Sequence, residues 1–311
     1  MNEFKHYTVM KKEAVDALNC QNGLIYVDCT LGGGGHSELI LQKISPDGKL
    51  IAFDIDQDAI DAASERLKDY KNLTIVKDSY TNIKSVLKNL GIEKITGGIL
   101  FDLGASYHQL TKQERGFSFS KEAPLDMRFN KDSDFSAYDV VNKYSENDLV
   151  KIFSEYGEER FSKRIAKAII EYRKHKPIKT TTELSGIIIE ATPRVKTSIH
   201  PATRVFQAIR IEVNHELQNV KNTLNDVLDL LEFGAIISVI SFHSLEDRVV
   251  KQVFKYHSTR CHCEKNQMIC TCPPPILELI NKKPIMASEQ EIRENPPSRS
   301  AKLRIAKCIR R

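Results

Sequence analysis

The sequence predicts an α/β fold in which a parallel sheet is interrupted by an inserted all-helical domain. Three observations predict this fold. Strand-like and helix-like segments alternate over about the first hundred residues, as in a series of βαβ units. The alternation then stops, and residues 110–204 show only helical spacing of apolar residues. Strand character returns in the C-terminal third, so we expect the insertion to leave the sheet after its fourth strand.

Each element follows from its pattern of apolar residues. Four apolar runs predict strands over 24–29, 49–54, 73–77 and 97–103. Helical spacing between them predicts helices over 36–44, 56–69 and 81–90. The insertion shows helical spacing in 149–156 and 161–172, and it is followed by a long helix over 205–231 and strands over 235–242 and 303–308. The 311 residues give room for two domains. They are a sheet domain of 1–109 and 205–311, and an inserted domain of 110–204.

A glycine-rich stretch between Asp28 and His36 is the most informative part of the chain. It follows an apolar strand and reads DCTLGGGGH. Glycines allow backbone N–H groups to approach a ligand with no Cβ in the way. Asp54 ends the next strand, about 20 residues further on, where a carboxylate can accept both hydroxyl groups of a ribose. The pattern therefore predicts a nucleoside-cofactor site, and a glycine-rich turn without a ligand is the alternative.

The spacing of the glycines separates two classes of cofactor. Counting from Gly32 and Gly34, the third glycine of a dinucleotide fingerprint would fall at Ser37. The third glycine, which allows close packing of the helix in pyrophosphate-binding sites, is therefore missing. Its absence disfavours NAD as the cofactor. Asp28, the glycine loop and Asp54 instead resemble the class I S-adenosylmethionine (SAM) methyltransferases, whose ligand has no phosphate. We therefore expect a Rossmann-like class I SAM-dependent methyltransferase sheet.

The predicted strand over 97–103 ends at a chemically important corner. Ligands of open parallel sheets bind beyond the carboxyl ends of the strands at the topological switch point, so Asp102 should face the cofactor. The residues after it include Ser106 and Gln109, whose side chains are suited to hydrogen bonding a target amine. Tyr80, after the third strand, could pack on an adenine ring. In the alternative interpretation, Asp102 only caps the next segment and Tyr80 belongs to the core.

Positive charge is segregated along the chain. The net charge is +5, but the segments 160–176 and 293–311 each contain seven basic residues and one acidic residue, so the remainder is net negative. Such patches are expected where a polyanion binds, because neutralising phosphates releases counterions and steers association. For either segment alone, a solvated helix face is the alternative.

The cysteines and the apolar runs bear on the compartment. No apolar run approaches the roughly 20 residues of a membrane helix, and residues 1–6 show no signal-peptide pattern. We therefore expect a cytoplasmic protein with no membrane partner. Seven cysteines in a chain of this length suit a reducing compartment better than a disulfide framework. The oligomeric state stays open, with a homodimer as one alternative.

Four of the cysteines form two C-x-C steps near His257 and His262; they are Cys261, Cys263, Cys270 and Cys272. Four thiolates can hold a structural zinc ion. The usual zinc steps are C-x₂₋₄-C, however, and these are tighter. We therefore expect reduced cysteines in a loop and no metal, with zinc binding left open.

Several strings spread along the whole chain resemble one family, the bacterial 16S ribosomal RNA (cytosine-N4)-methyltransferases, also called the RsmH or MraW family. They are RGFSF at 115–119, PLDMR at 124–128, YGEERF at 156–161, HPATR at 200–204 and SFHSLEDR at 241–248. The resemblance implies a SAM-dependent enzyme that acts on a cytidine in the decoding region of 16S rRNA in the small ribosomal subunit. One departure is that 106–109 read SYHQ where the family usually has SSPQ.

The resemblance also implies roles for individual residues. By position, the cofactor contacts would be Gly34, Gly35, His36, Asp54, Tyr80, Asp102 and Gln109. The catalytic candidates are Asp102, Ser106 and His243. The candidates for contact with substrate RNA are Arg160, Arg164, Lys167, Arg204 and Arg248.

Cytosine N4 is a weak nucleophile, whereas a sulfonium methyl group is already activated. Catalysis should therefore depend on alignment and on hydrogen bonds to N4, and Asp102 is placed to accept one. His243, Glu246, Asp247 and Arg248 follow the strand over 235–242 and could orient the base or its phosphate, or could form a helix cap and an ion-pair cluster.

Two other functions stay open. One is a methyltransferase of the same fold that acts on another amine, and the other is a nucleotide-binding module without chemistry. The acids at 28, 54 and 102 argue against the second. Whether naked RNA is a substrate, and which group takes the N4 proton, also stay open.

Overall fold

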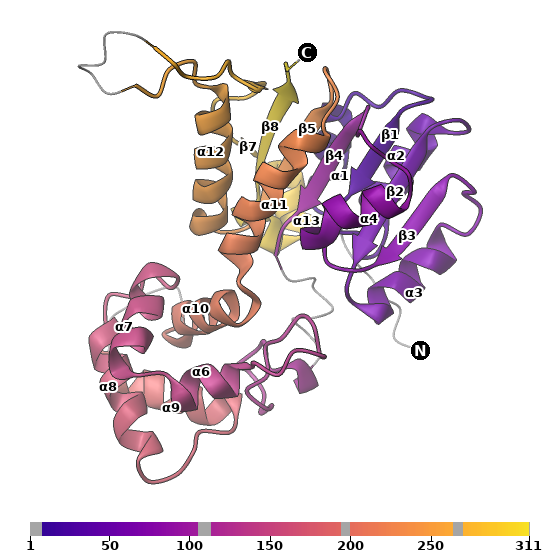
Figure 1. Cartoon of the computed structure of the whole chain (residues 1–311). Helices are drawn as coiled ribbons and strands as arrows, with labels where there is room; N and C mark the ends of the chain where they lie inside the picture. Colours follow the sequence, from indigo (N-terminus) through magenta and orange to yellow (C-terminus); the bar gives the residue numbers. More distant parts are fainter. Residues whose placement is uncertain (1–7, 105–112, 194–199, 264–269, 311) are drawn as a thin grey trace. The chain divides into compact units, whose positions relative to one another are not determined.

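The computed structural model describes residues 8–104, 113–193, 200–263 and 270–310 (Figure 1). The chain divides into two compact units. The sheet unit comprises Met1–Gly104 and Leu217–Arg311, and the helical unit comprises Ala105–Glu216. None of the described helices combines the length and the apolarity of a membrane span.

The described part of the sheet unit contains one eight-stranded sheet in the order β3-β2-β1-β4-β5-β8-β6, with β7 also paired to β8. The parallel strands are β1 (Ile25–Asp28), β2 (Lys49–Asp54), β3 (Leu73–Lys77), β4 (Gly98–Asp102) and β5 (Ile236–Ser241). The antiparallel strands are β6 (Leu277–Leu279), β7 (Ile285–Met286) and β8 (Lys302–Cys308). The strand order reverses between β1 and β4, so the topological switch point lies at their carboxyl ends.

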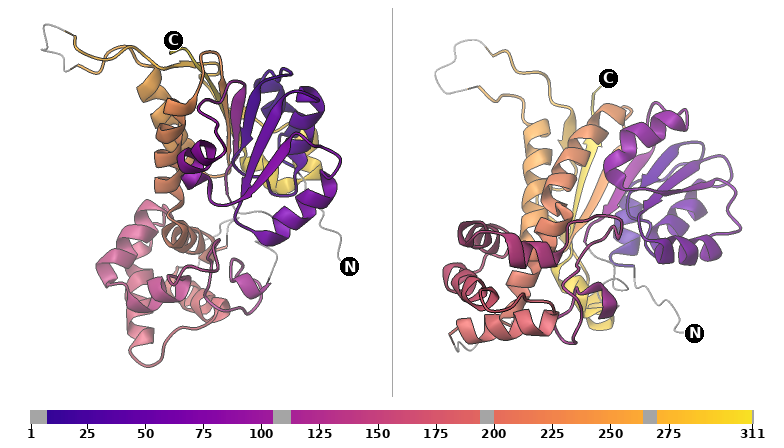
Figure 2. Two further views of the ribbon diagram at one scale, coloured as in Figure 1. Left: turned by 45° about the vertical axis from the view of Figure 1, so that its right-hand side comes forward. Right: turned by 60° about the horizontal axis from the view of Figure 1, so that its bottom comes forward.

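Helices cover both faces of this sheet (Figure 2). One face packs against α4 (Ile83–Asn89), α11 (Glu216–Leu230) and α12 (Ser244–Ser258). The other packs against α1 (Lys11–Ala17), α2 (Gly35–Ile44), α3 (Gln57–Arg66) and α13 (Glu289–Glu294). Successive strand residues serve opposite faces, as when Phe101 joins the first core and Leu100 the second. This explains why the central strands read as continuous apolar runs.

The helical unit has an apolar core of its own. Its helices are α6 (Ala137–Lys143), α7 (Glu146–Glu155), α8 (Ser162–Arg173), α9 (Thr181–Ala191) and α10 (Ala202–Asn214). Each contributes a buried stripe, represented by Val140, Phe153, Ile165, Ile188 and Phe206. Short 3₁₀ helices complete the described elements of the chain: η1 (Tyr80–Asn82), η2 (Gln113–Arg115) and η3 (Pro296–Ser300).

The α/β fold with an inserted helical domain is confirmed, and one predicted element is wrong. The expected long helix over 205–231 is two helices, because His215 adopts a left-handed conformation (φ 50°) that ends α10. Helix α10 packs in the helical core, whereas α11 packs on the sheet. The second boundary between the units therefore falls after Glu216 rather than after residue 204, and the first falls after Gly104 rather than after residue 109.

Candidate functional site

The glycine loop joins β1 to α2 in a conformation that requires glycine. Gly32 and Gly34 have positive φ angles (50° and 76°), which L side chains rarely adopt. A Cβ on Gly35 would clash with the hydroxyl group of Thr8. Gly34 is the N-cap of α2 and has no side chain that could accept a hydrogen bond. The first backbone N–H groups of the helix therefore have no acceptor from the N-cap residue.

Asp54 and the glycine loop lie together, as the sequence predicts. Oδ2 of Asp54 accepts the backbone N–H of Gly32 (2.8 Å), and Oδ1 accepts that of Asp56 (2.9 Å). These bonds fix the carboxylate at the end of β2, while each oxygen keeps a further lone pair. Burial raises the pKa of Asp54. The carboxylate is thus oriented and retains acceptor capacity for a ligand.

Asp28 has a different role from Asp54. Its buried carboxylate accepts the hydroxyl of Ser37 (2.7 Å) and the backbone N–H of Thr30 (3.1 Å). Burial raises its pKa to about 6. These contacts tie the end of β1 to the first turn of α2, so Asp28 supports the shape of the loop.

Asp102 ends β4 and carries a buried acceptor atom with no partner. Its backbone N–H donates to Oγ1 of Thr30 (2.7 Å), which fixes the strand end. Oδ2 lies 3.7 Å from Nδ1 of His36, whereas Oδ1 is buried and has no hydrogen-bond partner among the described residues. Burial raises the pKa of Asp102 well above its usual range, and the charges of Asp28 and Glu246 raise it further.

His36 is buried between Asp102 and the N-terminal segment. Its Nε2 lies 3.1 Å from the carbonyl oxygen of Val9, and a carbonyl can only accept, so we assign the proton to Nε2. Nδ1 lies on the side of Asp102, 3.7 Å from Oδ2. Both nitrogens are directed at the protein, which indicates that His36 positions Asp102 and the loop.

His243 lies at the same edge of the sheet, just beyond β5. Strands β4 and β5 pair with Asp102 opposite Ile240, so His243 follows three residues after the register partner of Asp102. Nδ1 of His243 accepts the backbone N–H of Glu246 (3.4 Å), and Oε2 of Glu246 accepts the N–H of Phe242 (2.8 Å). This capping box starts α12. Glu246 therefore acts as a helix cap, as the alternative interpretation of this segment predicted.

The capping box leaves one atom of His243 unused. Because Nδ1 accepts, the ring proton is on Nε2. Nε2 lies 3.1 Å from Oε1 of Glu246 but makes no hydrogen bond within the described chain, and its side chain is only 13% exposed. The edge formed by β4 and β5 therefore presents an acceptor on Asp102 that has no partner among the described residues, and a donor on His243 that lies against the Glu246 carboxylate.

The remaining predicted site residues differ in how far the structure places them. The half-buried ring of Tyr80 packs edge-on against Phe101 at a centroid distance of 5.8 Å, after β3. Ser106 and Gln109 lie outside the described residues. Sequence reasoning did not identify Thr30 or Thr8. Thr30 stands inside the predicted loop motif, whereas nothing in the sequence indicated that Thr8 packs on Gly35.

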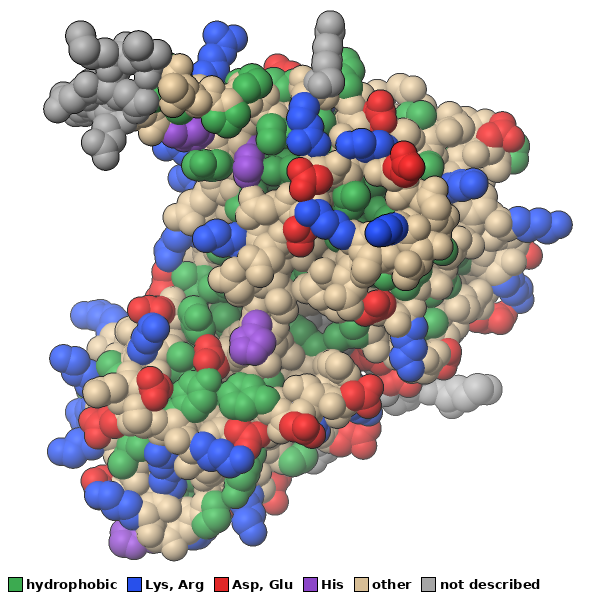
Figure 3. Space-filling view, in the orientation of Figure 1, with side chains coloured by type: hydrophobic (Ala, Val, Ile, Leu, Met, Phe, Trp, Pro, Cys, Tyr) green, Lys and Arg blue, Asp and Glu red, His purple; other side chains and the backbone are tan. Residues whose placement is uncertain are grey.

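The basic segment 160–176 divides into free and engaged side chains. Arg160, Lys163, Arg164 and Lys167 are exposed and form no ion pair among the described residues. Lys163, Arg164 and Lys167 lie in α8 on the face opposite the buried Ile165 and Ile169, and Arg160 lies just before the helix. Lys and Arg side chains gather along one edge of the helical unit (Figure 3). We call Arg160, Lys163, Arg164 and Lys167 the α8 basic face.

Other predicted basic residues are used inside the protein. Arg173 donates to the carbonyl oxygens of Val141 (2.6 Å) and Tyr144, and so caps the end of α6. Arg204 donates to the carbonyl of Glu158 (3.2 Å). Arg248 is exposed on α12 and already has a contact within the protein. In the second basic segment, Arg304 forms a two-bond pair with Asp247 (2.6 and 3.2 Å).

The comparisons with known proteins agree along the whole length of the chain. The model of the MraW methylase family matches residues 3–309. Three relatives carry the name ribosomal RNA small subunit methyltransferase H. The protein from Caldicellulosiruptor bescii is 54% identical over 307 residues, covering 98% of this chain and 100% of its own. Those from Clostridium botulinum (strain Loch Maree) and Clostridioides difficile are 50% and 48% identical, each covering 99% of this chain and 100% of its own.

Proposed function

The chain belongs to the MraW methylase family, and we propose that it methylates the N4 amine of one cytidine in the decoding region of 16S rRNA. SAM is the methyl donor, and the substrate is the small ribosomal subunit in the cytoplasm. The name shared by the relatives supports small-subunit rRNA as the substrate. The observation that supports the target atom is the buried Oδ1 of Asp102, which has no hydrogen-bond partner among the described residues at the edge where His243 also lies.

The residues around the glycine loop suit a nucleoside cofactor without phosphate. Bound SAM would supply a methyl group activated by the sulfonium charge. Asp54 would accept the ribose hydroxyls with its remaining lone pairs, and the backbone at Gly34 and Gly35 would line the site. Tyr80 would lie along the adenine ring, and Gln109 is a further proposed contact. His36 would act indirectly, because both of its nitrogens face the protein.

The pattern of donor and acceptor at the catalytic edge suits cytosine. The Watson–Crick edge of cytosine offers a hydrogen-bond donor at N4 and an acceptor at N3. Asp102 would accept from N4, and His243 would donate to N3. Uracil presents the opposite pattern at these two positions and would leave the Asp102 acceptor unpaired, which is costly in a buried site. Adenine has the same order of groups, so the methylated nucleoside itself must be identified.

Asp102 would assist transfer by holding the N4 amine. The N4 lone pair is delocalised into the ring, and a hydrogen bond from N4–H to a carboxylate favours a more localised lone pair. Alignment of N4 with the methyl group accounts for the remaining assistance. Ser106 is a further proposed contact of the amine. A stacked or paired cytidine cannot present N4 to a protein site, so the target must be unstacked.

The α8 basic face would bind rRNA phosphates. Arg160, Arg164 and Lys167 are exposed cations with no internal ion pair among the described residues, as required for contacts that release counterions. Arg204 and Arg248 are weaker proposals because both side chains already have protein contacts.

Transfer of labelled methyl groups tests the proposed substrate. Small subunits, large subunits and naked 16S rRNA from cells lacking this protein are each incubated with the protein and methyl-labelled SAM. We expect label in the 16S rRNA of small subunits and none in large subunits. The naked-RNA arm shows whether assembly is needed. Label in large-subunit rRNA or in ribosomal protein, with none in 16S rRNA, would contradict the proposal.

A further inference from the structure

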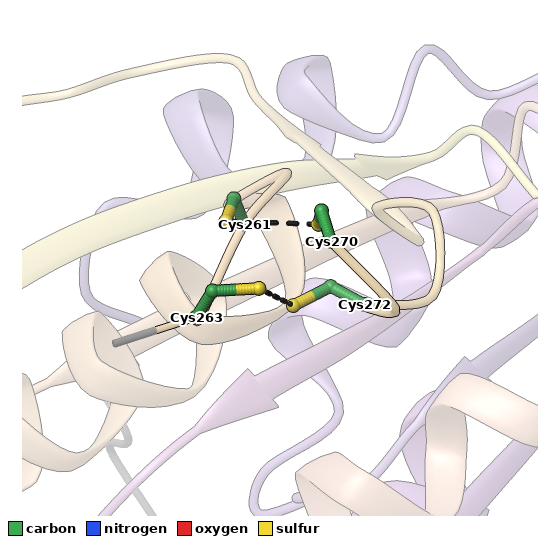
Figure 4. A group of neighbouring side chains, drawn as sticks. All are labelled: Cys261, Cys263, Cys270 and Cys272. Carbon is green, nitrogen blue, oxygen red and sulfur yellow. Dashed lines mark hydrogen bonds between the residues drawn. The ribbon is translucent and has the colours of Figure 1, made fainter. Parts of the chain in front are cut away.

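Four cysteine sulfur atoms converge between α12 and β6, in a part of the sheet unit that the proposed function does not use. Sγ of Cys263 lies 3.5 Å from Sγ of Cys272, and Sγ of Cys261 lies 3.7 Å from Sγ of Cys270 (Figure 4). All four sulfur atoms lie within 4.8 Å of one another. Each C-x-C step thus contributes both of its thiols to a single cluster.

These distances agree with one tetrahedral ion. Zinc–sulfur bonds are about 2.3 Å long, so two thiolates on a tetrahedral zinc lie about 3.8 Å apart. A disulfide needs about 2.05 Å, and all four cysteines are free. A binuclear iron–sulfur cluster would divide the thiolates between two irons, whereas here all four sulfur atoms lie within 4.8 Å of one another. We propose that Cys261, Cys263, Cys270 and Cys272 bind one structural zinc ion.

The surroundings of the cluster favour a site made of four sulfurs. His257 is engaged with Asn225, with Nε2 2.9 Å from Oδ1, and His262 stacks on Tyr256 at a centroid distance of 4.2 Å. The backbone N–H of His262 donates to Sγ of Cys272 (3.1 Å), a contact that stabilises a thiolate and orients it. The tight C-x-C spacing led us to expect no metal, but the convergence comes from pairing two such steps across the loop.

The position of the site indicates a structural role. Four sulfur ligands leave no open coordination position for a substrate. The site follows the end of α12, whose 15 residues span about 22 Å and place His243 at the opposite end. The backbone N–H of Ile276 donates to the carbonyl of His257 (2.9 Å), which closes the base of the loop. Zinc would hold Cys261 and Cys263 against Cys270 and Cys272 without contacting the cofactor.

Metal analysis of the full-length, untagged protein tests the proposal directly. We expect about one zinc per chain, and we expect Cys261→Ser and Cys272→Ser each to lose most of it. Cys20→Ser is the matched control, because it removes a half-buried thiol outside the cluster and should keep the zinc. Folded protein without zinc, stoichiometric iron in its place, or an intact mass that reveals disulfides would overturn the proposal.

Cobalt substitution gives a readout that does not depend on a variant folding. Protein loaded with Co²⁺ should show the strong visible and thiolate charge-transfer bands of a tetrahedral sulfur site. Removing the metal with a chelator should increase protease cleavage within 259–276 while SAM binding stays unchanged. The weak absorption of octahedral cobalt would contradict the four-sulfur site, and loss of SAM binding would contradict its separate structural role.

Discussion

At the scale of single residues, the site contains three carboxylates that differ in their hydrogen-bond partners. Asp28 has both oxygens engaged by protein donors, Asp54 has both engaged by the backbone N–H groups of Gly32 and Asp56, and Asp102 has one oxygen with no partner among the described residues. The three acids therefore do different work. Asp28 supports the loop, Asp54 is oriented for a ligand, and Asp102 is the one with an unmet acceptor in a buried position.

Replacing Asp54 tests the cofactor site. Asp54→Ala should weaken binding of SAM and of S-adenosylhomocysteine roughly 10- to 100-fold, because hydrogen bonds to a charged group contribute about 1.5–3 kcal/mol. Asp69→Ala, which removes an exposed carboxylate elsewhere on the sheet unit, is the control and should bind normally. Calorimetry measures both affinities. Unchanged binding in Asp54→Ala, or tight binding of NAD by the wild type, would contradict the assignment.

Replacing Asp102 tests the catalytic edge through its pH dependence. Burial raises the pKa of Asp102, so the acceptor form becomes populated only as pH rises, and single-turnover transfer should increase with pH. Asp102→Asn cannot titrate, and its slower transfer should lose this rise. Asp102→Ala should bind SAM but not transfer methyl groups. A wild-type pH profile in Asp102→Asn would rule out the role, and loss of SAM binding in Asp102→Ala would leave Asp102 as a cofactor-binding residue only.

At the scale of elements, the basic residues of the α8 region are of two kinds. Some are exposed and available to a partner, and others stabilise the helical unit. Arg164 and Lys167 point away from the buried stripe and Arg160 is exposed just before the helix, whereas Arg173 caps α6. The sequence shows only that all four are basic. It cannot show that the carbonyls of Val141 and Tyr144 lie within reach of Arg173, since that contact depends on how α6 and α8 pack.

Neutralising the α8 basic face should weaken binding to the small subunit. The triple variant Arg160→Gln, Arg164→Gln, Lys167→Gln lacks three phosphate contacts. The magnitude of the slope of log affinity against log salt concentration should therefore decrease by up to about 3. Lys174→Gln is the control, because Lys174 is already paired with Glu171 (2.7 Å). Binding is measured across a salt series, with SAM affinity measured in parallel. An unchanged slope, or an equal loss of SAM binding, would contradict the assignment.

The break between α10 and α11 shows where an element could not be predicted. Apolar residues keep helical spacing across His215, and neither Gly nor Pro marks the turn. The helices separate because Phe206 and Ile209 pack in one core while Leu224 and Val227 pack in another. Only the tertiary structure contains that information. The cysteine cluster is a second example, since the sequence spacing argued against the convergence that the fold produces.

At the scale of the whole molecule, the predictable part of the fold was the alternation of strands and helices. The runs over 49–54 and 73–77 are β2 and β3 with the expected bounds. The strand order and the antiparallel β8 could not be predicted, because pairing partners such as Ile236 and Lys307 are far apart in sequence. The loop acids were predictable because they end strands, whereas the unpartnered oxygen of Asp102 among the described residues depends on packing.

The structure distinguishes the two basic segments of the sequence. Two basic segments suggested two places for a polyanion. The C-terminal segment, however, uses Arg304 and Lys302 to pair with Asp247, and Arg310 donates to the carbonyl of Leu228. Part of its charge is therefore engaged within the sheet unit. The proposed binding of rRNA phosphates accordingly depends on the helical unit.

The identity of the methylated nucleoside tests the central claim most directly. Small subunits from cells lacking this protein are labelled with the wild-type protein and methyl-labelled SAM, and their 16S rRNA is digested to nucleosides. We predict that all the label is recovered as N4-methylcytidine and maps to one cytidine of the decoding region. Label on the C5 carbon of a cytosine or on an adenine would contradict the proposed function.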